Sequence, residues 1–207
     1  MAREGWVFIL PPLAAGGIAA WSGHTVVAIV LLAATLFLIQ FFRDPERAPE
    51  GGEDTVVSPA DGTVLSITEA PEAPPGARRR LSIFMSVFNC HVNRAPISGT
   101  LEDYAYVPGR MDAAFSDKAS IGNEQNRISL ARPGGHLIFK QITGALARRI
   151  VFYPRLGDEL RRGQRIGMIK FGSRVDLFLP DGAEVLVKDG DRVKAGRTPV
   201  ARWPQGG

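Results

Sequence analysis

The stretch Leu81-Ser-Ile-Phe-Met-Ser-Val-Phe88 decides the fold class, because it is the strongest of several short apolar runs rich in β-branched and aromatic residues. Turn signals such as Pro108-Gly109 separate these runs, and no long stretch with a 3.6-residue period lies between them. The pattern predicts a mainly β domain, folded as a β-sandwich or flattened barrel. The other predicted strands are Gly62–Thr68, Gly135–Ile142, Ile166–Phe171, Val175–Leu179 and Glu184–Val187.

Composition excludes several classes of protein. The chain has 207 residues, of which 45% are hydrophobic, so it can bury a core and is not disordered. A single cysteine, Cys90, excludes a disulfide framework and a cysteine metal cluster, and we expect no metal site. The polar stretch from Met111 to Arg127 is expected to form a short helix or a loop over a site.

The first 44 residues read as a hydrophobic membrane anchor of one or two helices. Residues 1–42 contain only two charged side chains, and two apolar runs, Val7–Trp21 and Thr25–Phe42, flank a Ser-Gly turn. About 20 apolar residues are needed to cross a bilayer, so two spans, or one span with a re-entrant piece, both fit. A cleaved signal peptide is the competing reading, but the apolar runs continue directly into charged residues. We expect residues 45–55 to form a linker and residues 56–207 to form the main domain.

Basic residues follow the anchor. Arg43, Arg47 and Arg78–Arg80 favour a cytoplasmic position for the domain at the cell (inner) membrane, and they could hold anionic headgroups. The net charge of +4 does not indicate nucleic acid, because no long basic run or aromatic stacking motif is present.

Three short stretches carry the candidate chemistry. Gly172-Ser173 is the only Gly-Ser step in the chain, and a serine after glycine can attack the preceding carbonyl where the turn is strained. Asp61 stands at the entry to a predicted strand, and His91 follows the strongest apolar strand. Taken singly, each has a more ordinary reading as a turn, a side-chain cap or a structural imidazole.

An internal repeat offers an alternative. Gly157–Ile166 and Gly190–Pro199 share the pattern G-D-x-[Leu/Val]-[Arg/Lys]-x-G-[Gln/Arg]. Two copies are too few for a solenoid, and such Gly-Asp turns are typical of biotinyl and lipoyl carriers. A membrane-tethered carrier or adaptor therefore stays open, although Lys188 lacks the flanking Met of those carriers.

Taken together, in order and spacing, the motifs resemble those of the short, membrane-associated branch of the phosphatidylserine decarboxylases, a pyruvoyl-dependent family. The resemblance runs through most of the chain, in the segments Phe41–Pro45, Ser58–Gly62, Phe88–Pro96, Asn123-Glu124 and Phe171–Asp176.

This resemblance implies that the chain cleaves itself between Gly172 and Ser173, giving a β chain of residues 1–172 and an α chain of residues 173–207. The α chain would begin with a pyruvoyl group made from Ser173, and the two chains would stay together as a heterodimer. Phosphatidylserine in the bilayer would lose CO₂ to give phosphatidylethanolamine through a Schiff base with that group. Neither a metal nor pyridoxal phosphate is expected.

The resemblance also implies roles for side chains. Asp61 is expected to orient the imidazole of His91, which would act as base in self-processing. The candidate substrate-binding residues are Arg94, His136, Asn123 and Glu124. Long-form relatives have a second histidine at the position of Arg94, and a threonine at the position of Arg174. The base therefore stays open between His91 and His136.

The chemistry is coherent, because the electrons left by CO₂ loss can delocalise into a protonated imine conjugated to the pyruvoyl amide. A membrane serine peptidase that uses Ser173 with a lysine or histidine is the second alternative. It would keep its own serine intact. The sequence leaves open whether the lipid is diacyl or ether-linked.

Overall fold

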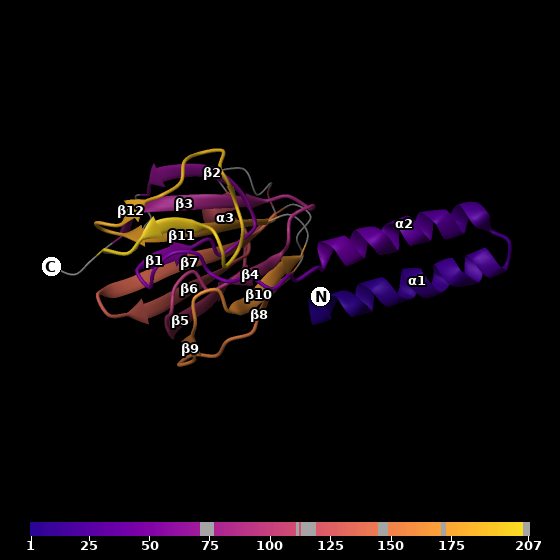
Figure 1. Cartoon of the computed structure of the whole chain (residues 1–207), viewed down its shortest axis with the longest axis horizontal. Coiled ribbons are helices and arrows are strands. Elements are labelled where there is room, and N and C mark those ends of the chain that lie inside the picture. Colours follow the sequence, from indigo (N-terminus) through magenta and orange to yellow (C-terminus); the bar gives the residue numbers. More distant parts are fainter. Residues whose placement is uncertain (71–76, 111, 113–118, 145–148, 171–172, 205–207) are drawn as a thin grey trace. The chain divides into compact units, whose positions relative to one another are not determined.

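The computed structural model describes residues 1–70, 77–110, 112, 119–144, 149–170 and 173–204. They belong to two compact units, Met1–Glu46 and Arg47–Gly207. The first unit is helical and the second is built mainly of strands (Figure 1), which confirms the predicted fold class.

The N-terminal unit is a helical hairpin. A 3-10 turn, η1 (Arg3–Gly5), leads into α1 (Trp6–Trp21), and α2 (Thr25–Phe41) packs against α1. In the turn between the helices, Gly23 has φ +79°, a left-handed conformation that glycine adopts at little cost. The Ser22 hydroxyl donates to the Ile18 carbonyl at 2.9 Å, which satisfies one end of α1. The predicted Ser-Gly turn is confirmed.

The two helices are short: α1 has 16 residues and α2 has 17. Within the described part of the chain, no helix is long and apolar enough to cross a membrane.

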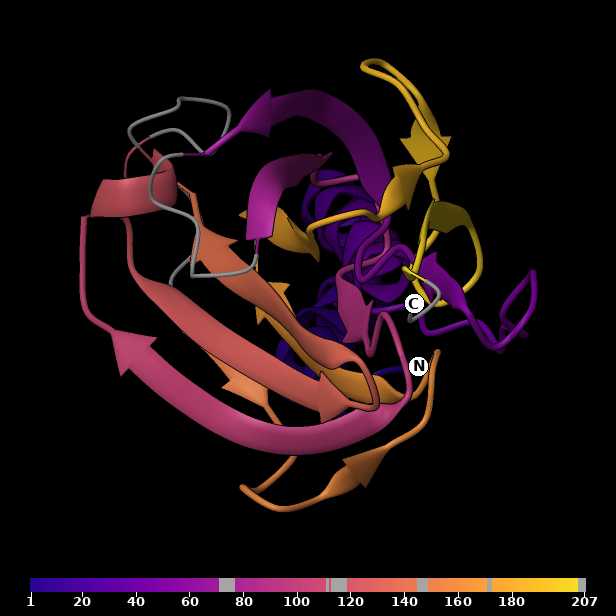
Figure 2. The ribbon, with the colours of Figure 1, turned by 90° about the vertical axis from the view of Figure 1, so that its left-hand side faces the viewer.

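An antiparallel sheet with the strand order β13-β2-β3-β11-β7-β6-β5-β9 forms the body of the second unit. Figure 2 shows how strongly this sheet curls, so that it resembles an open barrel. Its strands are β2 (Gly62–Glu69), β3 (Ala77–Met85), β5 (Gly99–Val107), β6 (Gln125–Arg132), β7 (Gly135–Thr143), β9 (Glu159–Leu160), β11 (Ser173–Pro180) and β13 (Arg192–Val193).

Two three-stranded sheets complete the unit. One has the order β1-β14-β12 and the other β4-β10-β8. A single helical turn, α3 (Ala119–Gly122), falls within the stretch that predicted a short helix. The strands are β1 (Thr55–Val57), β14 (Pro199–Arg202), β12 (Glu184–Val185), β4 (Val92–Arg94), β10 (Arg165–Lys170) and β8 (Arg149–Phe152).

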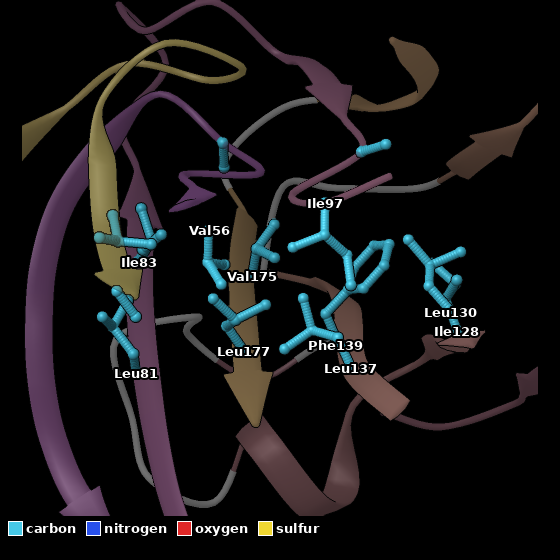
Figure 3. Close-up of a cluster of buried hydrophobic side chains, with 14 of the residues drawn as sticks. Val56, Leu81, Ile83, Ile97, Ile128, Leu130, Leu137, Phe139, Val175 and Leu177 are labelled. Atoms are coloured by element: carbon cyan, nitrogen blue, oxygen red, sulfur yellow. The ribbon is translucent and has the colours of Figure 1, made fainter. Parts of the chain in front are cut away.

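Strand β11 joins the two halves of the core. It pairs with β3 along its length and with β7 from Ser173 to Phe178. Side chains alternate across a strand, so Val175, Leu177 and Leu179 share one face and enter the hydrophobic core (Figure 3). Burying a valine or leucine contributes about 1.5–3 kcal/mol. The segment that follows the predicted cleavage site is therefore a central part of the fold.

The internal repeat forms the two edges of the curled sheet. Gly157 and Gly190 both have φ +89°, and the strands that follow them, β9 and β13, are the terminal strands on opposite edges. The later glycines of the two repeats, Gly163 and Gly196, meet closely, since a Cβ on Gly196 would lie 3.2 Å from the Cα of Gly163. The repeat thus brings the sheet edges together, which gives it an architectural role instead of a carrier role.

Leu177 tests the importance of the central strand. Replacing this fully buried side chain with alanine should lower the free energy of unfolding by about 2–5 kcal/mol, because a cavity would remain in the core. Urea unfolding followed by circular dichroism measures the change. Leu156→Ala, at a side chain that is 64% exposed, is the control and should cost less than about 0.5 kcal/mol. Equal losses would contradict the assignment.

Candidate active site

Ser173 is the first residue of the central strand. Its side chain is fully buried, and its hydroxyl donates to the Met85 sulfur at 3.2 Å. Met85 on β3 and Thr143 on β7 are its direct neighbours across the sheet. A thioether is a weak acceptor, so among the contacts of the described residues the Ser173 hydroxyl makes no strong hydrogen bond.

The predicted cleavage residue Gly172 lies outside the described residues, as does Phe171. The strands on either side are described, and they belong to different sheets: β10 ends at Lys170 in the small sheet, and β11 begins at Ser173 in the large one. The Gly-Ser bond therefore joins two sheets, at the start of the strand that is paired on both sides.

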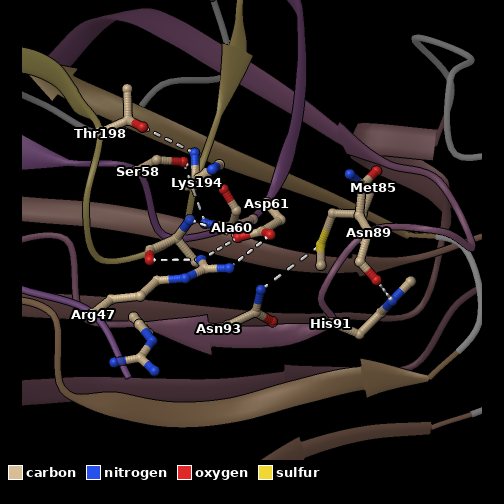
Figure 4. Close-up of polar contacts among 12 residues, drawn as sticks. Arg47, Ser58, Ala60, Asp61, Met85, Asn89, His91, Asn93, Lys194 and Thr198 are labelled. Carbon is tan, nitrogen blue, oxygen red and sulfur yellow. Dashed lines mark hydrogen bonds and ion pairs between the residues drawn. The ribbon is translucent and has the colours of Figure 1, made fainter. Parts of the chain in front are cut away.

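His91 lies next to this junction. Its backbone carbonyl accepts a hydrogen bond from the Ile169 amide of β10 at 3.3 Å, and β4, which begins at Val92, pairs with β10. The imidazole is fully buried, and its Nδ1 lies 3.0 Å from the Asn89 carbonyl oxygen (Figure 4). A carbonyl can only accept, so Nδ1 must carry the proton. In the neutral ring, Nε2 is then the proton acceptor.

A tight turn sets the position of the Asn89 carbonyl. Both the amide and the hydroxyl of Ser86 donate to the Asn89 side-chain oxygen at 2.8 Å, and the Asn89 amide donates to the Ser86 carbonyl at 2.9 Å. This turn ends β3 at Met85, three residues before the end predicted from sequence. The residue that contacts Ser173 and the residue that orients His91 are thus four positions apart.

Among the contacts described, Asp61 is not paired with His91, and its role toward His91 stays a prediction. Both carboxylate oxygens of Asp61 accept hydrogen bonds from the guanidinium of Arg47, and the Nη2–Oδ2 distance is 2.9 Å (Figure 4). Oδ1 also accepts a hydrogen bond from the Ala195 amide at 2.8 Å. Arg47 donates to the Ala195 carbonyl at 2.9 Å as well. Asp61 and Arg47 together clamp a turn of residues 173–207 to the larger part of the chain.

The repeat explains why Asp61 takes this position. Ser98, which precedes Gly99 at the start of β5, accepts from the Arg162 amide at 3.0 Å. Arg162 and Ala195 occupy the same place in the two repeats, so Asp61 and Ser98 are equivalent side-chain caps. The ordinary reading of Asp-Gly as a capped turn therefore accounts for Asp61. The similarity of Ser58–Gly62 to Ala95–Gly99 was the sequence signal that could have revealed it.

A chain of buried amides was missed from the sequence. The Asn93 amide nitrogen lies 3.7 Å from the Met85 sulfur, and its oxygen accepts from Gln141 at 2.8 Å. Gln141 in turn accepts from Asn126 at 3.2 Å, and the Tyr104 hydroxyl donates to Asn126 at 3.1 Å. The one sequence signal for this chain of amides was Asn93, which stands two residues after His91. The chain connects the Ser173 environment to four strands.

Tyr104 ends this chain as a neutral donor. Burial raises the pKa of Tyr104 above its ordinary value, and the hydrogen bond with Asn126 opposes this only in part. Its ring stacks on Phe152, with centroids 4.7 Å apart. The hydroxyl therefore keeps its proton at neutral pH and donates to the amide network.

Asn123 and Glu124 both bond to Thr143, which is the residue paired with Ser173 on β7. The Asn123 amide donates to the Thr143 carbonyl at 2.7 Å and to the Asp112 carbonyl at 2.8 Å. The backbone carbonyl of Glu124 accepts from the Thr143 amide at 3.0 Å and from its hydroxyl at 3.1 Å. The fully buried Asn123 thus fixes the local backbone, while the Glu124 side chain is partly exposed.

The other two predicted binding residues lie elsewhere. His136 is exposed near the far end of β7, where its Nδ1 lies 2.8 Å from a carboxylate oxygen of Glu102. Seven residues separate it from Thr143, about 23 Å along a strand, so the structure does not bring it to Ser173. Arg94 is buried and donates to the Gly163 carbonyl at 3.0 Å, which supports the turn where the repeats meet.

The opposite face of β11 carries a second polar cluster that was missed. Arg174 is fully buried; its Nε donates to Asp176 at 2.5 Å and an Nη to Ser82 at 2.7 Å. Ser120 of α3 donates to the other Asp176 oxygen. The two charges at i and i+2 within an apolar strand were the available signal. Because Arg174 is anchored, the backbone next to Ser173 is held firmly.

The predicted basic surface is also corrected in part. Arg80 is buried and donates to Ser120 at 3.5 Å and to Thr68 at 3.4 Å. Arg47 is buried against Asp61, as described above. Arg79 is exposed, and the side chain of Arg78 lies outside the described residues.

Two surface hollows lie away from Ser173. One, of about 660 Å³, is on the β5–β9 edge and includes Glu159 and Arg132. The other, of about 510 Å³, includes Arg79 and Pro180, at the opposite end of β11 from Ser173. We assign the candidate chemistry to Ser173 and His91, because these side chains have the required reactivity. Neither residue lines either of the two hollows.

Comparison with known proteins is consistent across the chain. The family model described as phosphatidylserine decarboxylase matches residues 34–201. A phosphatidylserine decarboxylase proenzyme of Symbiobacterium thermophilum is 45% identical over 208 residues, covering 99% of this chain and 96% of the relative. Proenzymes of the same name from Trichlorobacter lovleyi and Geotalea uraniireducens are 49% and 42% identical, covering 84% and 99% of this chain and 80% and 97% of their own lengths. The chain belongs to the phosphatidylserine decarboxylase family.

Proposed function

We propose that this enzyme removes CO₂ from phosphatidylserine to give phosphatidylethanolamine, and that it does so with a pyruvoyl group made from its own Ser173. The observation that carries the proposal is a fully buried serine hydroxyl at the first residue of the central strand, with a buried histidine in the adjoining turn. The names of the relatives support the substrate, and the word proenzyme in those names supports processing of the chain.

The surroundings of Ser173 fit a pyruvoyl group. The hydroxyl donates only to a thioether among the contacts described, so its loss would leave no strong hydrogen bond unmade. Met85 and Thr143 would hold the group from the two neighbouring strands. When formed, the group would supply an electron sink for the electron pair left at the serine Cα as CO₂ departs.

Self-cleavage would begin with proton transfer from Ser173 Oγ to Nε2 of His91, directly or through one water. The oxygen would attack the Gly172 carbonyl carbon, and the C–N bond would break as the Ser173 nitrogen takes a proton, leaving an ester. Removal of the Cα proton would then expel the Gly172 carboxylate and leave dehydroalanine. Addition of water and release of ammonia would complete the pyruvoyl group.

The fold would retain the small product after cleavage. Residues 173–207 include β11, which is hydrogen-bonded to β3 and β7, and β14, which pairs with β1. The Arg47–Asp61 clamp adds a link to Ala195. The two chains are therefore expected to stay together as a heterodimer.

In decarboxylation, the chain's own residues would exclude water and deliver a proton. Ser173, Met85, His91 and Asn93 are all fully buried or nearly so. His91 is the group that we assign to protonate the headgroup Cα, because its buried imidazole lies next to the junction before Ser173 and its Nδ1 is oriented by Asn89. Asn123 would set the backbone at Thr143, beside the reacting residue.

The helical hairpin is proposed as the attachment to the membrane. Large apolar side chains stand exposed on both helices, among them Trp21, Val26 and Leu36. Such a surface is stable when it is buried in lipid, and attachment would raise the concentration of the site near a lipid substrate. Location at the cell membrane, with the catalytic unit on the cytoplasmic side, follows as part of the proposal.

Replacing Ser173 with alanine should leave a single chain of 207 residues without decarboxylase activity, because no hydroxyl would remain to attack Gly172. Intact-mass spectrometry of the purified protein measures this, and the unaltered protein should give chains of residues 1–172 and 173–207. Ser129→Ala, at another buried strand serine, is the control and should cleave normally. An active, uncleaved Ser173→Ala protein would contradict the mechanism.

Replacing His91 with glutamine should slow self-cleavage by about 10²–10⁴-fold, the usual contribution of a general base. The rate is measured as the loss of full-length chain after synthesis. His136→Gln is the matched control, because this exposed side chain is paired with Glu102, far from Ser173, and the rate should stay within about twofold. If His136→Gln were the slower variant, the assignment of the base would be reversed.

The Arg47–Asp61 pair should act as a clamp. Arg47→Met would leave a buried carboxylate without its partner and should lower the free energy of unfolding by about 3 kcal/mol, whereas adding Asp61→Asn should recover part of the loss. Urea unfolding measures both. Self-cleavage in the double variant should stay within about threefold of normal. A loss of 100-fold or more would instead restore the pairing of Asp61 with His91.

A further inference from the structure

We propose that the Arg47–Gly207 unit docks directly on the surface of a lipid bilayer through an apolar rim at the end that carries Ser173. The rim consists of Phe88, Tyr106, Val107 and Ile121. The proposal rests on the proposed function and adds to it a membrane contact made by the catalytic unit itself, separate from the helical hairpin.

Strand register puts the rim and Ser173 at one end of the sheet. Phe88 follows Met85, which lies opposite Ser173. Ile121 belongs to α3, which is followed directly by Asn123, bound to Thr143. From β3 to β5 there are four strand spacings, or about 19 Å. Directly paired residues connect Val107 to the residue next to Ser173. The pairs run across four strands, from Val107 to Gln125, Ile142 and Arg174.

The rim side chains face solvent although they are large and apolar. Ile121 is 72% exposed, Phe88 69% and Tyr106 54%. In α3, Ala119 and Ser120 are fully buried, and Ser120 bonds to Asp176 of the sheet, so Ile121 is the residue that the turn presents outward. Exposed apolar residues gathered from three separate segments mark a contact surface more often than chance exposure.

Charge at the same end selects an anionic lipid surface as the occupant. Arg149 and Lys170 lie directly opposite each other on β8 and β10, and Lys170 is three positions before Ser173 in the sequence. Two basic side chains on neighbouring strands would attract an anionic lipid surface. Arg110 is exposed here as well, and Asp112 and Glu124 are acidic, so among the described residues named here the basic side chains outnumber the acidic ones by one.

The chemistry of the substrate requires such a contact. The acyl chains of a phospholipid stay in the bilayer, and the atom that loses CO₂ is in the headgroup. A protein surface with an apolar rim can sink about 5–10 Å into the headgroup region. Ser173 is fully buried behind the rim, so docking of this end would bring the headgroup toward it without removing the lipid from the membrane.

A polarity-sensitive fluorophore tests the contact without reference to activity. Ile121→Cys is labelled in the full chain, and Leu156→Cys is the matched control, since Leu156 is 64% exposed and precedes β9, at the opposite end of β5. The native Cys90 is buried and should not label. With phosphatidylglycerol–phosphatidylcholine vesicles that carry a spin-labelled quencher lipid, the label at 121 should shift to the blue and be quenched. The label at 156 should not respond.

Kinetics supply the second test. Ile121→Ser should lower decarboxylation of phosphatidylserine in vesicles by about tenfold, while activity on monomeric short-chain phosphatidylserine stays within twofold. Leu156→Ser should change neither. The proposal would be overturned if Ile121→Ser lowered the activity on both substrates. It would also be overturned if the fluorescence of the labels at 121 and 156 responded equally to vesicles, or if the label at 121 were already shielded from water without vesicles. If the unaltered protein decarboxylated neither substrate, the proposed function would fail, and the label would still decide the docking surface.

Discussion

The double pairing of β11 is the constraint on which the rest of the structure depends. Its hydrogen bonds to β3 and β7 hold Ser173 at a fixed position, with Met85 on one side and Thr143 on the other. Because the preceding strand belongs to a different sheet, the bond before Ser173 lies where the chain leaves one sheet for another. A break before Ser173 would leave the described pairs of β11 with β3 and β7 in place.

Polar groups are buried on both faces of this strand, where burial is costly unless every group is paired. On the core face, Asn93 and Gln141 link the Met85 environment to neighbouring strands. On the other face, Arg174 and Asp176 bond to each other and to Ser82 and Ser120. These two polar clusters are fully paired in only one arrangement of the strands around Ser173. An apolar core alone would tolerate other arrangements more easily, because its contacts are less directional.

The two edges of the sheet are held by equivalent devices, and this changes the interpretation of Asp61. Asp61 and Ser98 cap equivalent turns in the two repeats, at the amides of Ala195 and Arg162. The glycines that follow these two residues, Gly196 and Gly163, lie close together. Arg47 adds an ion pair on one side only. Asp61 therefore has a structural role in closing the sheet, while its role in catalysis stays a prediction.

The sequence by itself determined the mainly β fold, the apolar N-terminal helices and the family, and it predicts Gly172-Ser173 as the reactive step, because these depend on local periodicity and on motifs a few residues long. It did not determine which side chains meet. His136 and His91 look alike as candidate bases in sequence, but strand length carries His136 away from Ser173. The partners of Asp61 and Arg174, and the placement of Phe88 and Ile121 toward one end of the sheet, were likewise decided only by tertiary structure, because pairing in a curled antiparallel sheet joins residues that are distant along the chain.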